Sequence, residues 1–106
     1  MRVVFSDGAR RDLAQLGVEL RRRAGKDVAL RIVGELRERT TSLADFPEQG
    51  NVPPELATVG GLDYRELHHA PYRIIYRRVA DTVEIALVAD GRHDFRRLLA
   101  ARLLRP

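Results

Sequence analysis

The sequence contains no cysteine, so it offers neither a disulfide framework nor thiolate ligands for a metal, and its core must hold the fold unaided. It also lacks any apolar run near the roughly 18 residues of a membrane span. Charge appears within the first few residues of MRVVFSDGARRDL, unlike a secretory signal. We therefore expect a cytoplasmic protein with no membrane partner. A chain of 106 residues with 44% hydrophobic content predicts one compact domain, residues 1–106.

Motifs for small-molecule chemistry are missing as well. Gly60-Gly61 lacks the G-x-G-x-x-G or Walker spacing and precedes an extended segment, so it forms no phosphate cradle. His68 and His69 are adjacent on a predicted strand, where neighbouring side chains point to opposite faces and cannot chelate one metal together. We expect no cofactor and no metal.

Positive charge is concentrated in the last third of the chain. Residues 72–106 hold eight arginines against four acids, which accounts for the whole formal net charge of +4. A basic end on a neutral body suggests an acidic partner, either nucleic acid or an acidic protein segment. The alternative is an ordinary solvated, arginine-rich surface.

The first part of the chain predicts a strand followed by a helical hairpin. Arg2–Phe5 is β-branched and aromatic, and Ser6-Asp7 can cap a helix directly after it. Apolar residues then recur at helical spacing, at Ala9, Leu13, Leu16 and Leu20, until Gly25 ends the pattern. Asp27 offers a second cap. The apolar stripe that follows it consists of Ala29, Ile32, Val33, Leu36 and Leu43.

Residues 45–61 predict a loop, because they contain three of the five prolines and three of the eight glycines. Three extended segments follow, at 62–68, 72–79 and 82–89. In the last segment Val83, Ile85, Leu87 and Ala89 occupy alternate positions, which predicts a strand packed on one face. Asp94 can cap a final helix whose apolar stripe is Phe95, Leu98, Leu99 and Leu103.

The predicted element order is therefore β-α-α-β-β-β-α. The first strand avoids an exposed edge only by joining the three-stranded meander. This predicts an α+β fold with a four-stranded, mainly antiparallel sheet, a helical hairpin on one face and a C-terminal helix.

Several stretches, taken in order, resemble the RelE/ParE toxin superfamily along nearly the whole chain. They are Ala9-Arg10-Arg11-Asp12-Leu13, Phe46-Pro47-Glu48-Gln49-Gly50, Tyr64-Arg65-Glu66-Leu67, Pro71-Tyr72-Arg73-Ile74-Ile75-Tyr76, and Val88-Ala89-Asp90-Gly91-Arg92-His93-Asp94 followed by Leu98-Leu99 and Arg102-Leu103-Leu104. The last of these is closer to the ParE branch, which often carries Gly-Arg-Arg-Asp where His93 departs from the pattern. The resemblance implies the toxin of a type II toxin–antitoxin pair, with a cognate antitoxin as partner.

The two branches of the superfamily imply different targets. RelE-like members resemble ribosome-dependent mRNA endoribonucleases, whose chemistry needs a base, an acid and cations for the phosphorane charge. In that branch lysines tend to lie on the strand before the Tyr-Arg segment, where this chain has Tyr64 and Glu66, and no tyrosine follows Tyr76. We therefore predict a ParE-like inhibitor of DNA gyrase without a catalytic site.

Two alternatives stay open. The first is a RelE-like ribonuclease acting on ribosome-bound mRNA, with Arg73, Arg92, His93 and Glu66 as catalytic residues. His93 could then serve as an acid, since an unperturbed imidazole titrates at about 6.5. A histidine beside Arg92 and before a helix cap is also an ordinary surface residue. The second alternative is an inactive toxin or a regulatory nucleic-acid binder.

The predicted target-binding residues are Arg73, Arg77, Arg92 and His93. Arg73 shares a strand face with Ile75 and Arg77, and a guanidinium held on a rigid strand suits phosphate or carboxylate. A purely structural pair with Glu66 on the neighbouring strand is the competing interpretation.

An antitoxin segment, disordered when free, is expected to lie along the last helix and to form a hetero-oligomer with the toxin. The predicted antitoxin-binding residues are Arg96, Leu98, Leu99, Arg102 and Leu103.

Overall fold

The computed structural model describes residues 1–57, 63–92 and 94–104. Its helices and strands follow the expected order: β1 (Arg2–Phe5), α1 (Asp7–Ala24), α2 (Lys26–Thr41), β2 (Tyr64–His69), β3 (Tyr72–Val79), β4 (Thr82–Asp90) and α3 (Phe95–Leu103). Two short 3-10 turns, η1 (Ser42–Ala44) and η2 (Pro54–Leu56), lie between α2 and β2. The predicted α+β fold is confirmed.

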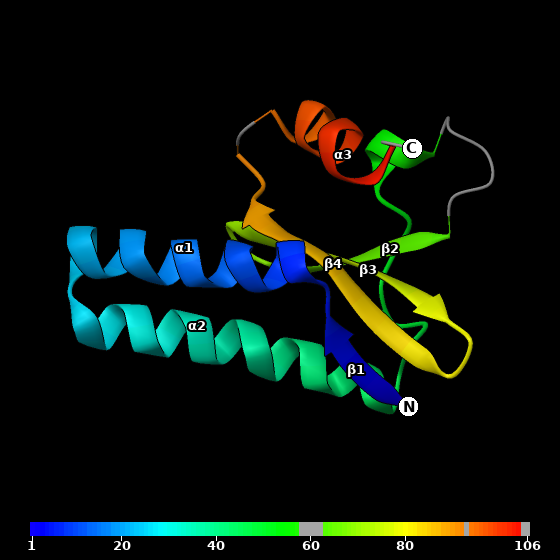
Figure 1. Cartoon of the computed structure of the whole chain (residues 1–106), viewed down its shortest axis with the longest axis horizontal. Helices are drawn as coiled ribbons and strands as arrows, with labels where there is room; N and C mark the ends of the chain where they lie inside the picture. The colour runs from blue at the N-terminus through cyan, green and yellow to red at the C-terminus, as the bar shows by residue number, and fades with distance from the viewer. Residues whose placement is uncertain (58–62, 93, 105–106) are drawn as a thin grey trace.

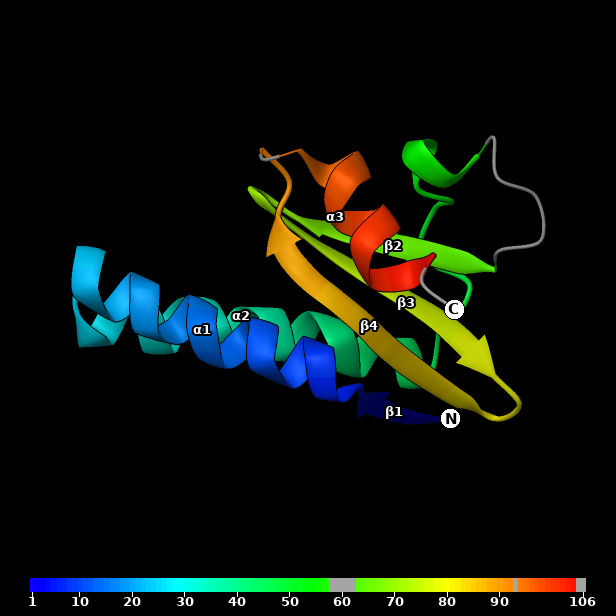
Figure 2. The ribbon, with the colours of Figure 1, turned by 45° about the horizontal axis from the view of Figure 1, so that its top comes forward.

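The four strands form one sheet in the order β1-β4-β3-β2. β2, β3 and β4 pair antiparallel, whereas β1 pairs parallel with β4. The α1–α2 hairpin projects to one side of the sheet in Figure 1, and Figure 2 shows α3 lying across β3 and β4. None of the described helices is long and apolar enough to cross a membrane.

The helical hairpin begins at a cap and turns at a glycine. The Ser6 hydroxyl accepts a hydrogen bond from the backbone N–H of Ala9, as its sequence position predicted. Gly25, with a φ of +94°, both ends α1 and precedes α2. Asp27 was expected to cap α2 but lies in its first turn, where its negative charge still favours the positive end of the helix dipole.

Each face of the sheet has its own apolar cluster. On the hairpin side, Leu13 and Leu36 pack with alternate residues of β3, namely Tyr72, Ile74 and Tyr76. On the other side, Phe95 and Leu99 of α3 pack with Ile75, Leu87 and Leu56. The expected alternation along β3 is confirmed, and α3 covers the face that the hairpin leaves open.

The one-face prediction for β4 is wrong. Val83 and Ile85 belong to the hairpin-side cluster, but Leu87 packs beneath α3. The pairing with β3 shifts at this point, because Ile75 lies opposite Leu87 while Tyr76 lies opposite Ile85. The unpaired Ala86 is a β-bulge, and one extra residue turns the side chains beyond it to the other face.

Candidate functional site

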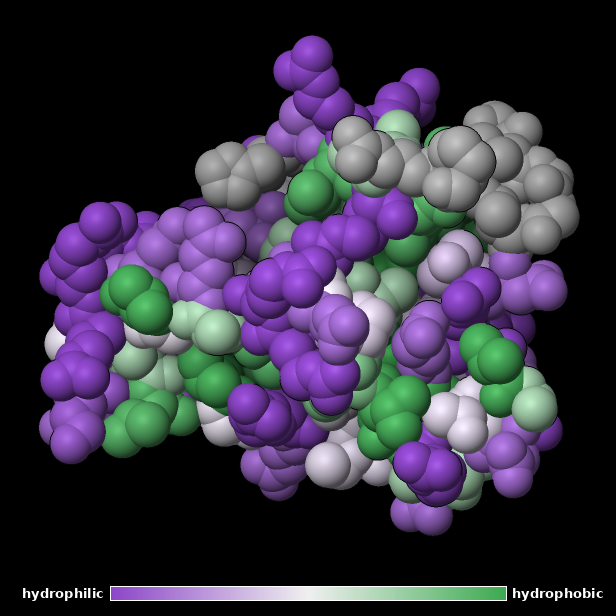
Figure 3. Space-filling view, viewed as in Figure 1, coloured by the Kyte–Doolittle hydropathy of each residue, from purple (hydrophilic) through white to green (hydrophobic). Residues whose placement is uncertain are grey.

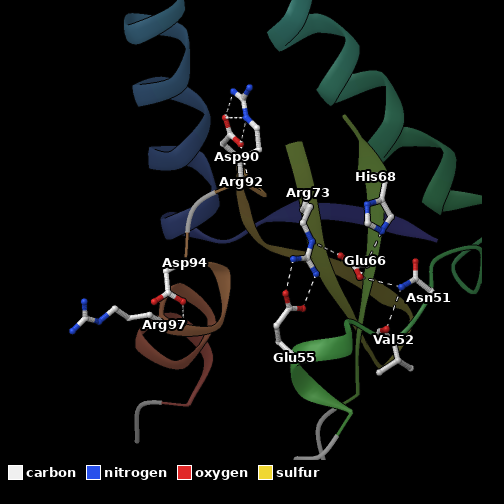
Figure 4. Close-up of polar contacts among 10 residues, drawn as sticks. All are labelled: Asn51, Val52, Glu55, Glu66, His68, Arg73, Asp90, Arg92, Asp94 and Arg97. Atoms are coloured by element: carbon white, nitrogen blue, oxygen red, sulfur yellow. Dashed lines mark hydrogen bonds and ion pairs between the residues drawn. The ribbon is translucent and has the colours of Figure 1, made fainter. Parts of the chain in front are cut away.

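Arg73 lies at the centre of a cluster of ion pairs on the α3 side of the sheet. Its Nε donates to Glu66 Oε1 at 2.6 Å, and its Nη1 and Nη2 donate to the two carboxylate oxygens of Glu55 at 2.7 and 2.8 Å. The Arg73 Cζ atom lies 3.8 Å from the centroid of the Phe95 ring. The side chain is only 12% exposed. Figure 4 shows Glu55 reaching Arg73 from η2, and Glu66 reaching it from β2.

Glu66 is the buried acid of this cluster. Its side chain is 0% exposed, and besides Arg73 it accepts a hydrogen bond from Asn51 Nδ2 at 3.0 Å. The backbones of Asn51 and Glu66 are also paired, at 2.7 and 3.2 Å. The structure thus contains the Arg73–Glu66 pair that was the competing interpretation of Arg73 in the sequence.

The loop that supplies Asn51 is fastened to the sheet by Tyr76. The Tyr76 hydroxyl donates to the Pro47 carbonyl at 2.9 Å and accepts from the Gly50 N–H at 3.0 Å. A Cβ atom at Gly50 would come within 2.7 Å of that hydroxyl, so the close approach requires glycine. Burial raises the pKa of Tyr76, which keeps the hydroxyl protonated as a donor.

Gly91 serves the same purpose for Arg73. A Cβ atom there would lie 2.5 Å from Arg73 Cδ, and the Gly91 N–H donates to the Pro71 carbonyl at 2.8 Å. The glycine of the Gly91-Arg92-His93-Asp94 stretch therefore leaves room for the aliphatic part of Arg73.

The electrostatics of the cluster favour fully charged side chains. Hydrogen bonds from Arg73 hold the pKa of the Glu55 carboxyl below its ordinary value, against the opposing effect of burial. The same hydrogen bonds raise the pKa of Arg73. Glu55, Glu66 and Arg73 together carry one more negative than positive charge. Arg96 of α3 adds a weaker attraction to Glu55.

The other predicted target-binding residues are more exposed. Arg92 pairs with Asp90, through its backbone N–H at 2.9 Å and its guanidinium at 2.7 Å. Arg77 pairs with Glu84 at 3.1 Å and is half-exposed. Arg77 also borders a cleft of about 470 Å³ with Arg65 and Arg78 at the far end of β3. His93 lies outside the described residues.

His68 and His69 point to opposite faces of β2, as predicted from their adjacency. His69 Nε2 lies 2.9 Å from Glu35 of α2. His68 Nε2 lies 3.6 Å from Glu66 on the Arg73 side.

The predicted antitoxin-binding residues of α3 differ in accessibility. Leu99 is buried in the core, whereas Leu98 and Leu103 are partly buried and Arg96 is exposed. Arg102 forms a bidentate pair with Asp12 of α1, at 2.8 and 3.0 Å, and donates to the Ala86 carbonyl at 3.0 Å. Arg102 therefore fastens the end of α3 to α1 and β4.

Sequence reasoning did not identify a groove between α1 and α2. The hairpin groove has a volume of about 550 Å³ and is lined by Leu13, Ala14, Gly17, Val18, Ala29, Leu30 and Val33, with Arg10, Arg21, Lys26 and Arg37 also at its wall. Val18 is 68% and Leu30 is 63% exposed. Figure 3 shows apolar surface over the hairpin, on the left of the view, between hydrophilic side chains.

Glu55 and Asn51 were missed for a different reason. Both lie in the proline-rich segment that the sequence identified only as a loop, and no local pattern marks a loop acid that folds back onto a strand. Pro53-Pro54 immediately before Glu55 was the one available signal, since it begins η2.

Comparisons with known proteins agree on one family. The model of the family described as ParE toxin of type II toxin-antitoxin system, parDE, matches residues 3–95. A solved structure of the chromosomal ParDE toxin–antitoxin system from P. aeruginosa is similar, with a TM-score of 0.70 and 20% identity over 85% of this chain and 95% of that one. The toxin–antitoxin complex RelBE2 from Mycobacterium tuberculosis is similar with a TM-score of 0.59 and 26% identity, over 84% of this chain and 88% of that one. No curated protein sequence matches the chain.

Proposed function

The chain belongs to the ParE toxin family of type II toxin–antitoxin systems, and from this premise we propose that it arrests growth by binding DNA gyrase, without a bond-breaking site of its own. In this proposal it acts in the cytoplasm and is neutralised by a cognate antitoxin.

The observation that supports a binding role over a nuclease role is the charge around Arg73. Cleavage of an RNA phosphodiester develops negative charge that free cations must stabilise. Arg73 instead faces two carboxylates, from Glu55 and Glu66, and Arg92 faces Asp90. A cluster that is itself negative opposes such a transition state.

The RelE-like ribonuclease remains the second candidate, because the fold is also similar to the RelBE2 complex. That mechanism would use Glu66 as the base. Its carboxylate is buried and already accepts hydrogen bonds from Arg73 and Asn51, so it is poorly placed to take a proton from a nucleotide hydroxyl.

For the gyrase contact we propose Arg73, Arg77, Arg92 and His93. Arg77 and Arg92 present exposed guanidinium groups from the same side of the molecule as Arg73, and each is paired only with an acid at the surface. Exposed pairs of this kind exchange partners at little cost, since they contribute about 1 kcal/mol or less.

For the antitoxin we propose a segment that lies along α3, over Arg96, Leu98 and Leu103, with Leu99 and Arg102 holding the helix in position. The similar solved structures are toxin–antitoxin systems, which supports a protein partner. The same segment can continue into the hairpin groove, because Arg102 joins the end of α3 to α1. An apolar floor with basic residues around it fits an acidic amphipathic helix.

The gyrase proposal is tested by incubating purified protein with gyrase and supercoiled plasmid, and in parallel with translating ribosomes and mRNA. We expect cleaved plasmid trapped on gyrase and intact mRNA. The double variant Arg77→Glu/Arg92→Glu should lose the trapped DNA. Its matched control, Arg22→Glu/Arg23→Glu, makes the same charge change on exposed residues at the far end of α1 and should remain active. Cleavage of ribosome-bound mRNA with untouched gyrase would establish the RelE-like alternative, and growth without arrest would favour an inactive toxin.

The antitoxin proposal is tested by co-expression with the neighbouring open reading frame. Leu98→Asp and Val18→Asp should each weaken the complex and its rescue of growth. Val79→Asp, which places the same charge on an exposed apolar residue outside both surfaces, should not. Equal complex formation by all three variants would place the antitoxin elsewhere.

A further inference from the structure

Arg73 is held in one orientation by two groups that do not use its outer edge. Glu66 binds the Nε atom, and the Phe95 ring lies against the guanidinium plane. The remaining edge, with Nη1 and Nη2, points toward Glu55 (Figure 4). A guanidinium fixed in this way is a preorganised fork for two oxygens of one anion.

The two acids that contact the fork are not equivalent. Glu66 lies on a central part of β2, is 0% exposed and is also bound by Asn51. Glu55 lies on the three-residue turn η2, and its side chain is 21% exposed. If Glu55 moved away, Glu66 would still balance the charge of Arg73. Glu55 is therefore the exchangeable partner.

The edge that Glu55 occupies has the chemistry of a phosphate site. Carboxylate and phosphate oxygens accept the same pair of parallel N–H bonds from arginine. Arg96 lies close enough to Glu55 to stabilise its negative charge, so a second cation faces the same position. With Glu55 displaced, Arg73, Arg96 and Glu66 leave one net positive charge there.

We propose that the outer edge of Arg73 is a phosphate-binding site that the Glu55 carboxylate occupies in the free protein. A phosphate group competes with Glu55 for Nη1 and Nη2, while Glu66 and Phe95 keep the fork in place. The biological use of this site rests on the proposed role of Arg73 in target contact, with a backbone phosphate of the gyrase-bound DNA as the natural ligand. The binding itself does not depend on gyrase.

Internal competition sets how strongly phosphate binds. The apparent affinity equals the intrinsic affinity multiplied by the fraction of molecules in which the fork is open. If Glu55 occupies the fork in about nine molecules of ten, its removal strengthens phosphate binding roughly tenfold. Glutamine at position 55 keeps the size of the side chain but removes the charge that binds the fork.

The test is a titration with inorganic phosphate and with pyrophosphate at constant ionic strength, followed by the NMR signal of the Arg73 Nε–H group. Glu55→Gln should bind both anions roughly tenfold more tightly than the wild type. Glu48→Gln is the matched control, because Glu48 also pairs with arginines, Arg65 and Arg78, but lies away from the fork. It should titrate like the wild type.

A second variant identifies the binding atoms. Arg73→Lys in the Glu55→Gln background keeps a cation beside Glu66 but has no fork, so the gain should disappear. Equal affinities for wild type and Glu55→Gln, or a gain that survives Arg73→Lys, would overturn the proposal. If Glu55→Gln failed to fold, the wild-type titration alone would decide, since its Arg73 signal must still respond at higher phosphate. Because no step uses gyrase, a negative result here leaves the gyrase assay interpretable, and a failed gyrase assay leaves this result intact.

Discussion

Replacing Arg73 with alanine should lower the free energy of unfolding by about 3–5 kcal/mol, because it leaves a buried carboxylate without its cation. The Glu66 side chain is 0% exposed, so water cannot replace the guanidinium at its Oε1 atom. The lost contact with the Phe95 ring adds to this cost. For a domain of this size, the expected loss corresponds to a decrease of at least about 12 °C in Tm.

Urea unfolding of three variants separates the causes. Arg73→Ala should show the full loss. Arg73→Ala/Glu66→Gln should recover part of it, since a neutral amide removes the unpaired charge while its oxygen can still accept from Asn51. Glu55→Ala should cost no more than about 1 kcal/mol, because that carboxylate is partly exposed and Arg73 keeps Glu66.

The reasoning would be refuted by an Arg73→Ala protein within about 1 kcal/mol of wild type, or by a double variant no more stable than the single one. The sequence pattern alone predicted that Arg73 and Arg92 could both become alanine with little loss of folding, because neither belongs to an apolar stripe. The burial of Glu66 changes that expectation for Arg73. A toxicity test should therefore use Arg73→Lys.

Two further predictions concern the core and the response to acid. Leu87→Asp should unfold the protein because Leu87 is buried beneath α3, whereas Val18→Asp, at an exposed position, should keep a wild-type midpoint in thermal unfolding; similar midpoints for both would contradict the β4 register. The hydrogen bonds from Arg73 place the pKa of Glu55 in the folded state below its ordinary value of 4.5, so its contribution to stability is present above that pH and is lost as the pH falls through the folded pKa. Stability curves from pH 6 to pH 2 should fall less steeply for Glu55→Gln, and parallel curves would contradict this pairing.

Local patterns in the sequence were sufficient for the elements themselves. The spacing of Leu13, Leu16 and Leu20 marks a helix because an α-helix presents every third or fourth residue to one side. The Ser6 cap, the loop at 45–61 and the alternation along β3 depend on equally local chemistry. The requirement to protect the first strand from edge exposure then predicted a four-stranded sheet with the hairpin on one face. Element order and layer arrangement followed from residues within a few positions of one another.

Only the tertiary structure shows what depends on residues far apart in the chain. β1 pairs parallel with β4, a choice that no pattern within either strand specifies. The bulge at Ala86 sends Leu87 to the α3 face, because a single extra residue reverses every later side chain without altering the local composition. The site around Arg73 joins Glu55 from a loop, Glu66 from β2 and Phe95 from α3. Their meeting depends on how three separate segments pack, so the sequence identified Arg73 as a functional candidate while its surroundings came from the fold.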